Sequence, residues 1–191
     1  ERAARVGARS VVVTFDRHPA SVVRPDAAPR LLTNTAQKLE LLAGTGVDAV
    51  VVLSFTPEQS KEIPSDFVQR VIVDGLHAST VIVGSDFHFG HMRQGNVTLL
   101  REMGERHDFT CEPVVLISRG DDIDEPVSST AIRRALAGGE IATAAKMLGH
   151  SYEVVGTVVT GDQRGRTIGF PTANVEIPNG MCVPSDGVYA E

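Results

Sequence analysis

A group of hydroxyl and guanidinium side chains at residues 127–134 has the residue types that bind an anion. Ser128 precedes an amphipathic run, and its hydroxyl can accept a hydrogen bond from a main-chain N–H of the first helical turn. Ser129, Thr130 and Arg133 follow at the helix start, where unpaired N–H groups and a partial positive charge collect. These groups predict a phosphate site. An ordinary capped helix with exposed arginines is the alternative, and this stretch alone leaves both interpretations open.

A second candidate site lies in residues 161–174, a glycine-rich basic segment that ends in Pro-Thr-Ala-Asn. Its three glycines and two arginines can form a flexible loop that folds over phosphates. Thr172 and Asn174 are oxygen donors two positions apart, so in an extended chain both can reach one Mg²⁺–phosphate cluster. The alternative is a glycine-rich hairpin with a proline turn.

Two further segments follow predicted strands. In residues 14–19, Asp16 and His18 can contact a substrate while Pro19 fixes the turn, although a loop histidine is often simply solvated. In residues 84–95, Gly84 lets the chain turn close to a ligand.

The segment 84–95 also carries side chains that can recognise a nucleotide or a flavin. Asp86 can accept a hydrogen bond from a ribose, an adenine amine or a flavin group. Phe87 and Phe89 offer stacking or apolar surface, and we expect at least one of them to belong to the core. His88 and His91 have the letters of the HxGH signature of nucleotidylyltransferases. They follow a later strand and precede a loop, so we assign them no catalytic role.

Strands that alternate with helices must position these segments. We predict strands at residues 10–15, 48–55, 80–84 and 109–118, and helices at 34–46, 65–76, after Asn96, after Ser128 and at 140–148. Ser65 is the predicted cap of its helix, and the strands are apolar on both faces, as buried parallel strands are. This order predicts an α/β fold with one parallel sheet wrapped by helices on both faces, which binds ligands at the carboxyl ends of its strands.

The pattern changes after residue 150. From Tyr152 the chain alternates and then shows no helical period, which predicts the start of an all-β unit. We therefore place a domain boundary near His150, with one domain at residues 1–150 and the start of another at 151–191.

Composition restricts the partners. The net charge of −6 disfavours nucleic acid or an anionic membrane, and no apolar run is long enough to span a bilayer. Cys111 and Cys182 lie far apart in sequence, so we expect reduced thiols and a cytoplasmic location. The expectation of small-molecule substrates comes from the family resemblance given below, and the oligomeric state is not predicted.

Five stretches, taken in order, resemble the bacterial bifunctional riboflavin kinase/FMN adenylyltransferases. They are TFDRHP, VGSDFHFGHMRQG, VSSTAIRRAL, GRTIGFPTANV and PSDGVYA, and together they extend over nearly the whole chain. The resemblance implies a nucleotidylyltransferase-type, Rossmann-like α/β domain followed by the truncated start of a riboflavin kinase β-barrel. It also implies ATP and Mg²⁺ as cofactors, and riboflavin, FMN and FAD as substrates and products.

The resemblance assigns roles residue by residue. The implied ATP-binding residues are Ser128, Ser129, Thr130, Arg133, Gly161, Gly165, Arg166, Thr172 and Asn174. Thr172 and Asn174 are also the implied metal ligands. The implied flavin or substrate residues are His18, Pro19, Gly84, Asp86 and Phe87.

The groups that would perform the chemistry are absent from this sequence. The family's HxGH histidines are expected upstream of Glu1, and its general-base glutamate downstream of Glu191. We therefore expect a fragment of a longer enzyme of FAD biosynthesis, with no catalytic residue of its own and little activity by itself. Another nucleotidylyltransferase of the same fold, or a non-catalytic module that binds nucleotide or flavin, is the alternative.

Overall fold

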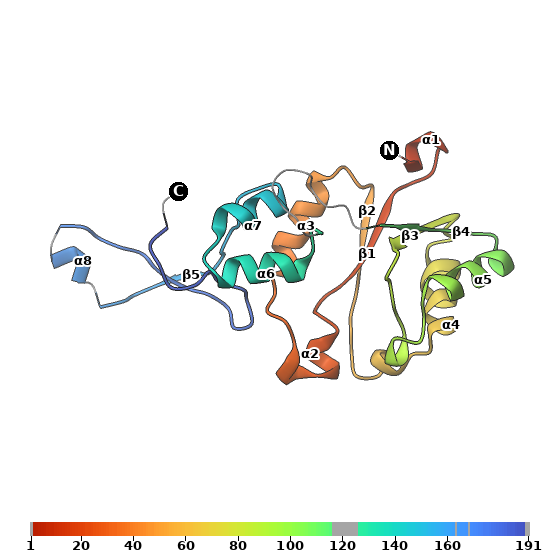
Figure 1. Cartoon of the computed structure of the whole chain (residues 1–191), viewed down its shortest axis with the longest axis horizontal. Helices are drawn as coiled ribbons and strands as arrows, with labels where there is room; N and C mark the ends of the chain where they lie inside the picture. Colours follow the sequence, from red (N-terminus) through yellow and green to blue (C-terminus); the bar gives the residue numbers. More distant parts are fainter. Residues whose placement is uncertain (1, 116–125, 163, 168, 190–191) are drawn as a thin grey trace. The chain divides into compact units, whose positions relative to one another are not determined.

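The computed structural model describes residues 2–115, 126–162, 164–167 and 169–189. Contacts between these residues define two compact units, the first bounded by residues 1–29 and 39–118 and the second by 30–38 and 119–191. Figure 1 shows the elements of each unit along the chain. None of the helices in the described part of the chain combines the length and apolar character that crossing a bilayer requires.

The first unit contains two parallel strand pairs. Strand β1 (Val11–Phe15) pairs with β2 (Ala49–Leu53), and β3 (Thr80–Gly84) pairs with β4 (Thr110–Val114). All four predicted strands are present and their parallel pairing is confirmed, although residues 116–118 of the last one lie outside the described residues. The described strands form two separate two-stranded sheets rather than the predicted single sheet. The fold is therefore α/β with small parallel sheets.

The prediction that these strands are buried is wrong. Val52 is 37% exposed and Ile82 is 54% exposed, and most other strand residues are half-buried. In the described sheets each strand has one hydrogen-bonded neighbour, so each strand keeps one open edge. The β-branched composition fits any pleated strand and does not report how many neighbours the strand has.

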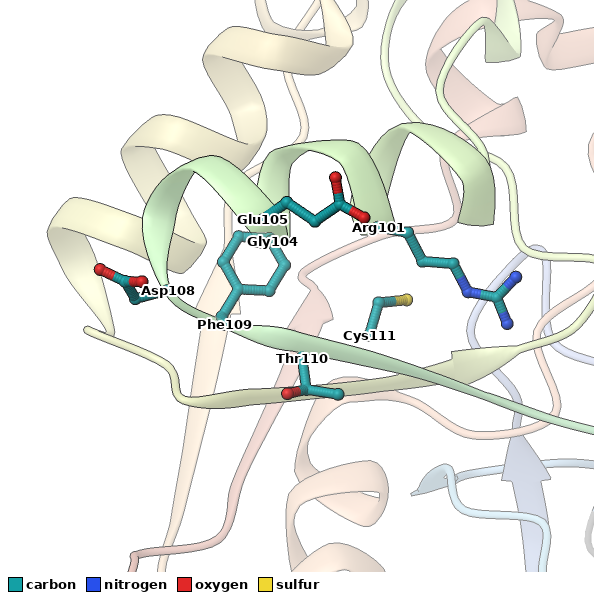
Figure 2. Close-up of a pocket in the computed structure, with 7 residues that line it drawn as sticks. All are labelled: Arg101, Gly104, Glu105, Asp108, Phe109, Thr110 and Cys111. Atoms are coloured by element: carbon teal, nitrogen blue, oxygen red, sulfur yellow. The ribbon is translucent and has the colours of Figure 1, made fainter.

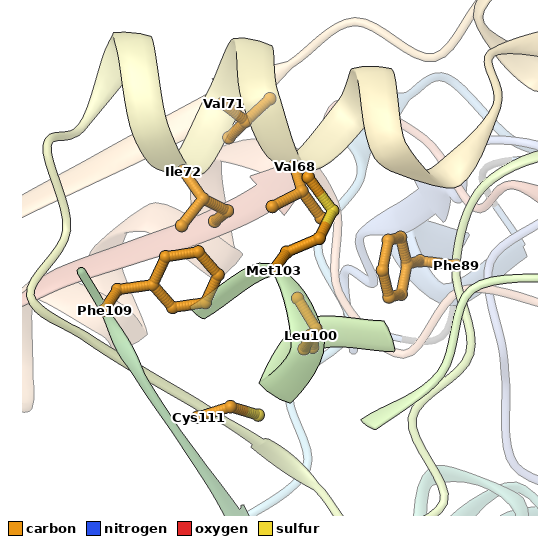
Figure 3. Close-up of a cluster of buried hydrophobic side chains, with 8 residues drawn as sticks. All are labelled: Val68, Val71, Ile72, Phe89, Leu100, Met103, Phe109 and Cys111. Carbon is orange, nitrogen blue, oxygen red and sulfur yellow. The ribbon is translucent and has the colours of Figure 1, made fainter. Parts of the chain in front are cut away.

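A compact apolar cluster forms the core of the first unit (Figure 3). It lies between helix α5 (Val97–His107) and a helix that starts as α4 (Pro64–Phe67) and continues as the π-helix η3 (Val68–Gly75). Its buried members are Val68, Val71, Ile72, Phe89, Leu100, Met103, Phe109 and Cys111. Burial of such side chains stabilises the fold by about 1.5–3 kcal/mol each.

The starts of these helices test the capping predictions. Asn96 caps α5, because its side-chain oxygen accepts the Leu99 N–H at 3.0 Å. Ser65 does not cap its helix: the cap residue is Ile63, which makes no side-chain cap bond, and Pro64 occupies the first turn. Proline suits that position because it has no N–H to leave unpaired and its φ is already helical.

The remaining helices of the first unit are short, apart from α3, which spans the boundary between the units. Their bounds are α1 (Arg2–Arg5), α2 (Ala20–Val23), η1 (Pro25–Ala27), α3 (Thr35–Gly44), η2 (Gln59–Lys61) and η4 (His91–Arg93). At the start of α3, Asn34 and Gln37 each accept the other's main-chain N–H, at 2.9 and 3.1 Å. Leu39 and Leu42 are half-buried, whereas Ala43 is exposed.

Helices α6 (Ser129–Ala137) and α7 (Ile141–Leu148) form the core of the second unit. Gly138 and Gly139 separate the two helices, and α7 ends at Gly149, whose φ of 80° is left-handed. Cys182 completes this core from far along the chain. The main chain of Leu31 pairs with residues 180–182, since its N–H donates to the Gly180 carbonyl and its carbonyl accepts the Cys182 N–H.

An exposed antiparallel pair follows, β5 (Thr157–Val159) with β6 (Asn174–Glu176). The connection between them contains a one-turn helix, α8 (Arg164–Thr167), where we predicted no helix. Short local hydrogen bonds explain this turn: the Thr167 hydroxyl donates to the Arg164 carbonyl at 2.7 Å. A single turn of this kind carries no apolar period that a sequence pattern can reveal.

Candidate active site

Asp16 joins the carboxyl ends of β1 and β2. Its main-chain N–H donates to the Leu53 carbonyl at 3.0 Å, and its side-chain Oδ1 accepts the Phe55 N–H at 3.0 Å. Both carboxylate oxygens also accept from the Arg17 guanidinium, at 3.2 and 3.1 Å. Hydrogen bonds from Arg17 and Phe55 lower the pKa of Asp16. The carboxylate is therefore bound to this chain's own groups, and its first role here is to fix the turn that leads to His18.

His18 and Pro19 lie directly after that turn. The Nδ1 atom of His18 accepts the Ala20 N–H at 3.1 Å, and the His18 carbonyl accepts from the Ser21 hydroxyl at 2.7 Å. Pro19 has helical φ and ψ angles and is the residue directly before α2, which begins at Ala20. The predicted turn is thus a helix start, which holds the half-buried imidazole in one orientation.

The exit of β3 carries Gly84, Asp86 and Phe87. The Phe87 N–H donates to the Gly84 carbonyl at 3.0 Å, which closes a tight turn. A Cβ atom at position 84 would lie 3.0 Å from Asp86 Oδ1, so glycine makes room for this carboxylate to fold back over the strand end. Asp86 and Phe87 are both exposed and can therefore meet a ligand.

At least one phenylalanine of this loop was predicted to belong to the core, and this is confirmed. Phe89 is 8% exposed and belongs to the core, whereas Phe87 is 36% exposed. Their rings stack, with centroids 5.4 Å apart and planes 18° from parallel. Phe87 thus presents an aromatic surface that is supported from below by a core ring.

His88 and His91 do not form a pair at one ligand. His88 Nδ1 is 2.7 Å from the Asp86 carbonyl, and His91 Nδ1 is 3.1 Å from the Ser60 carbonyl. A carbonyl accepts, so each Nδ1 carries the proton in these bonds. His91 lies in the short helix η4 and not at the start of the first helix of the fold. The two imidazoles thus bind carbonyls of different segments, and their lack of a catalytic role stays a prediction.

In the second unit, the predicted cap of α6 is confirmed. Ser128 Oγ accepts the Ala131 N–H at 3.1 Å, and the helix begins at Ser129. Ser129 and Thr130 are exposed at this start, while Ala131 on the opposite face is buried. Two hydroxyls therefore stand beside first-turn N–H groups that have no partner within the helix, a setting that favours an anion.

Arg133 is held near this helix start by a long-range bond. Its Nε atom donates to the Arg30 carbonyl at 2.6 Å. The neighbouring Tyr152 hydroxyl donates to the Cys182 carbonyl at 2.7 Å, and burial raises the pKa of Tyr152 to about 12. Burial also raises the pKa of the Cys182 thiol, which the positive charge of Arg133 partly offsets. Arg133 is half-buried, and its bond to the Arg30 carbonyl sets the direction of its side chain.

The glycine-rich segment and the Pro-Thr-Ala-Asn stretch come together. A Cβ atom on Gly161 would overlap the Asn174 side chain, and one on Gly165 would lie 3.3 Å from Thr172 Oγ1. Arg166 is the third residue of α8. The structure thus brings Gly161 against the Asn174 side chain, which leaves no room for a Cβ atom, and Gly165 near Thr172, where the Phe170 carbonyl excludes a side chain.

This arrangement fits a magnesium–phosphate group. Thr172 and Asn174 are exposed, and their hydroxyl and amide oxygens are hard donors of the kind that Mg²⁺ accepts beside phosphate oxygens. The adjoining glycines let main-chain N–H groups approach the phosphates closely.

The pocket in Figure 2 lies elsewhere in the first unit. It has a volume of about 560 Å³ and is lined by Arg101, Gly104, Glu105, Asp108, Phe109, Thr110 and Cys111. These residues belong to the end of α5 and the amino end of β4, whereas the predicted residues of this unit follow carboxyl ends of strands. This hollow is therefore not the predicted site.

Comparison with known protein families identifies both parts of the chain. The family model described as FAD synthetase matches residues 1–131, more than half of the chain. The chain belongs to the FAD synthetase family. The family model described as riboflavin kinase matches residues 148–191.

Curated relatives of this FAD synthetase family member carry both activities in their names. Three bifunctional riboflavin kinase/FMN adenylyltransferases are 38%, 37% and 36% identical, from Listeria monocytogenes, Escherichia coli K12 and Pseudomonas fluorescens respectively. The alignments cover 98%, 94% and 99% of this chain but 59%, 56% and 59% of the relatives. The chain thus spans under three-fifths of their length.

A solved structure is also similar. A crystal structure described as a macrolide-efflux protein from Streptococcus pneumoniae is 28% identical to this FAD synthetase family member, with a TM-score of 0.81. The match covers 98% of this chain and 60% of that chain.

The sequence did not predict several groups that fix the candidate segments within each unit. The Asp16–Phe55 bond, the Arg30 carbonyl that binds Arg133, and the Tyr152–Cys182 bond all join residues far apart in the sequence. An aspartate directly after a strand was a usable signal for the first of these. The other two involve main-chain carbonyls, which leave no trace in residue type.

Proposed function

We propose that the full-length protein makes FAD from riboflavin in two ATP-dependent steps. The observation that carries this proposal is the start of α6, where Ser129 and Thr130 are exposed beside a capped helix start inside the residues matched by the FAD synthetase model. The names of the relatives, which include both activities, support it.

In the adenylyl transfer, a phosphate oxygen of FMN attacks the α-phosphate of ATP, pyrophosphate leaves and FAD forms. Ser129 and Thr130 donate hydrogen bonds to the polyphosphate, with first-turn N–H groups beside them, and Arg133 supplies positive charge. Asp86 and Phe87 bind the flavin or the adenosine, and Gly84 makes room for them. His18 and Pro19 contribute from the exit of β1. Positioning and charge neutralisation, more than covalent chemistry, account for catalysis of such a step.

In the kinase step, the terminal ribityl hydroxyl of riboflavin attacks the γ-phosphate of ATP, ADP leaves, and a carboxylate base takes the proton. Thr172 and Asn174 would hold Mg²⁺, which neutralises phosphate charge when bound. Gly161, Gly165 and Arg166 line the phosphates. The closeness of the two glycines to the oxygen donors supports this assignment.

The finer features of the fold belong to the same proposal. We assign residues 1–150 to a Rossmann-like adenylyltransferase domain and residues 151–191 to the start of a riboflavin kinase barrel. The gap between the two family matches, residues 132–147, supports a boundary near His150. The free thiols of Cys111 and Cys182 are consistent with a reducing cytoplasm. The 191-residue chain alone is expected to have little activity.

The test uses full-length protein supplied with riboflavin, ATP and Mg²⁺, and separates FMN from FAD by chromatography. Thr130→Ala should lower FAD formation and leave FMN formation unchanged, whereas Asn174→Ala should lower FMN formation and leave adenylylation of added FMN unchanged. Loss of FMN formation in Thr130→Ala, or loss of adenylylation of added FMN in Asn174→Ala, would contradict this division of labour. Wild-type protein that binds flavin and ATP without turnover would favour a non-catalytic module, and transfer of a nucleotide to another acceptor would favour a different nucleotidylyltransferase.

A further inference from the structure

We propose that Glu62 and Arg70, which lie outside the predicted nucleotide and flavin sites, position the loop that carries Asp86 and Phe87. This inference rests on the proposed adenylyltransferase function and adds two positioning residues to it. The loop in question is residues 84–95, which we call the β3 exit loop.

The two side chains form a two-point ion pair. Arg70 Nε donates to Glu62 Oε1 at 2.8 Å, and Arg70 Nη2 donates to Glu62 Oε2 at 2.7 Å. Two parallel bonds between planar groups fix their relative orientation. The Arg70 side chain is 47% exposed, so the pair contributes little to global stability. We therefore assign the ion pair a role in fixing the orientation of the two side chains and not in stabilising the whole fold.

Glu62 and its neighbours hold the far end of the β3 exit loop. The Glu62 carbonyl accepts the His91 N–H at 2.8 Å, and the His91 imidazole donates to the Ser60 carbonyl at 3.1 Å. Pro64 lies against Gly90, where a Cβ atom would be 2.6 Å from the proline ring. The far end of the β3 exit loop therefore packs on residues 60–64 and is hydrogen-bonded to them. The ion pair with Arg70 fixes the position of Glu62 relative to η3.

Arg70 also contacts the loop through a series of aromatic rings. Its guanidinium carbon lies 6.0 Å from the centroid of the Phe67 ring. Phe67 lies 5.7 Å from Phe89, and Phe89 stacks on Phe87 at 5.4 Å. Figure 3 shows Phe89 beside Met103 at one end of the apolar core. The exposed Phe87 ring thus packs on Phe89, Phe89 packs on Phe67, and the Arg70 guanidinium lies over Phe67. The orientation of Phe87 therefore depends on the position of Arg70.

The contacts of residues 60–64 and the row of aromatic rings both lead to the loop that carries the predicted flavin-contacting residues. Neither leads to the start of α6. Loss of the ion pair should therefore loosen Asp86 and Phe87 while leaving the predicted phosphate contacts at Ser129 and Thr130 unchanged. Flavin recognition should weaken more than ATP recognition, an asymmetry that a general loss of stability would not produce.

The experiment compares Arg70→Met with Arg106→Met in the full-length protein. Methionine keeps an unbranched stem of similar length but has no donors. Arg106 is an exposed arginine in the last turn of α5 and serves as the matched control. Arg70→Met should raise the KM for FMN about tenfold, the scale expected for a contact group that is slightly misplaced, and change the KM for ATP less than about twofold. Arg70→Lys keeps the charge without the two-point geometry and should fall between the two.

Hydrogen exchange of the His91 amide in the ligand-free protein gives a readout that does not depend on activity. Exchange should be about tenfold faster in Arg70→Met than in wild type, and unchanged in Arg106→Met. Unchanged exchange at His91, or equal changes in the two KM values, would overturn the positioning role. A wild-type protein that makes no FAD and binds no FMN would instead overturn the proposed function, while the exchange result would still decide whether the ion pair orders the loop.

Discussion

Ser128 and Ser129 are adjacent serines with different expected roles, and replacing each with alanine tests the α6 site. Ser128 Oγ accepts the Ala131 N–H, so Ser128→Ala leaves that donor without its cap. Loss of an N-cap costs about 1 kcal/mol. The cost should stay near this value, because Ile132 and Leu136 remain buried and hold the rest of the helix in place.

Ser129 is exposed and makes no cap bond, so Ser129→Ala should change the free energy of unfolding by less than about 0.5 kcal/mol. A hydrogen bond to a charged group contributes about 1.5–3 kcal/mol, which corresponds to a fall of roughly 10- to 100-fold in kcat/KM for ATP in FAD formation. Thr98→Ala is the matched control, since Thr98 is an exposed hydroxyl in the first turn of another capped helix, α5.

The assay is urea unfolding of the full-length variants, followed by helical circular dichroism, together with steady-state FAD formation at varied ATP. The expected pattern is lower stability for Ser128→Ala, unchanged stability with weak ATP use for Ser129→Ala, and no change in either for Thr98→Ala. If Ser129→Ala lowers stability as much as Ser128→Ala, the cap has been misassigned. If Ser129→Ala keeps both stability and kcat/KM, phosphate is not bound at this helix start.

Three further predictions concern the fold. Gly95→Ala should destabilise by about 1–3 kcal/mol, because a Cβ atom would lie 2.8 Å from the Phe89 ring and from Pro64; Gly44→Ala, with nothing within 4 Å, is the control in thermal unfolding. Leu136→Ala should destabilise by about 2–5 kcal/mol in urea, since Leu136 is 0% exposed in the second core; a loss below about 1 kcal/mol would contradict this burial. Hydrogen bonds from the Ser10 hydroxyl and N–H lower the pKa of Asp48 below 3.8, so the carboxylate stabilises the fold above that pH and this contribution is lost as the pH falls through the lowered value. Wild type should therefore be more stable than Asp48→Asn near about pH 6 and lose that advantage progressively as the pH falls below 3.8, and a constant difference would count against the linkage.

Local chemistry explains what the sequence could predict. Ser128 and Asn96 are caps because their oxygens reach N–H groups three residues ahead, and such spacing is visible in any sequence. Residues 80–84 form a strand between clear turn signals, and the structure has it with the same bounds. The parallel pairing also followed from the alternation of strands and helices.

The predictions of a helix cap, of strand burial and of an absent helical turn were wrong because these features depend on neighbouring residues or strands. Ser65 does not cap the helix because the helix already starts at Pro64, so Ser65 lies within its first turn. The strands were expected to be buried, yet burial depends on how many strands lie beside them, which composition does not record. The turn of helix in residues 164–167 is too short to have a period.

The candidate site was predictable as separate segments and not as contacts. Glycines, hydroxyls and arginines identified the segments around Ser129 and Asn174. The contacts of Gly161 and Gly165 with the Pro-Thr-Ala-Asn stretch, and the Arg133–Arg30 bond, depend on how the chain returns on itself. Pairs of this kind have no sequence signal in a single chain.

The pairing of Leu31 with residues 180–182 has a consequence for biosynthesis. The bond from Arg133 to the Arg30 carbonyl spans 103 positions, and the Cys182 bond to Leu31 spans more. At about 5–20 residues per second, a ribosome delivers these partners many seconds after residues 30–33 have left the exit tunnel. The first unit can close around its own core during that interval, whereas the second must wait for Cys182. A nascent chain paused before that residue would expose Leu31, Leu32 and the apolar face of α6, the kind of surface that chaperones bind.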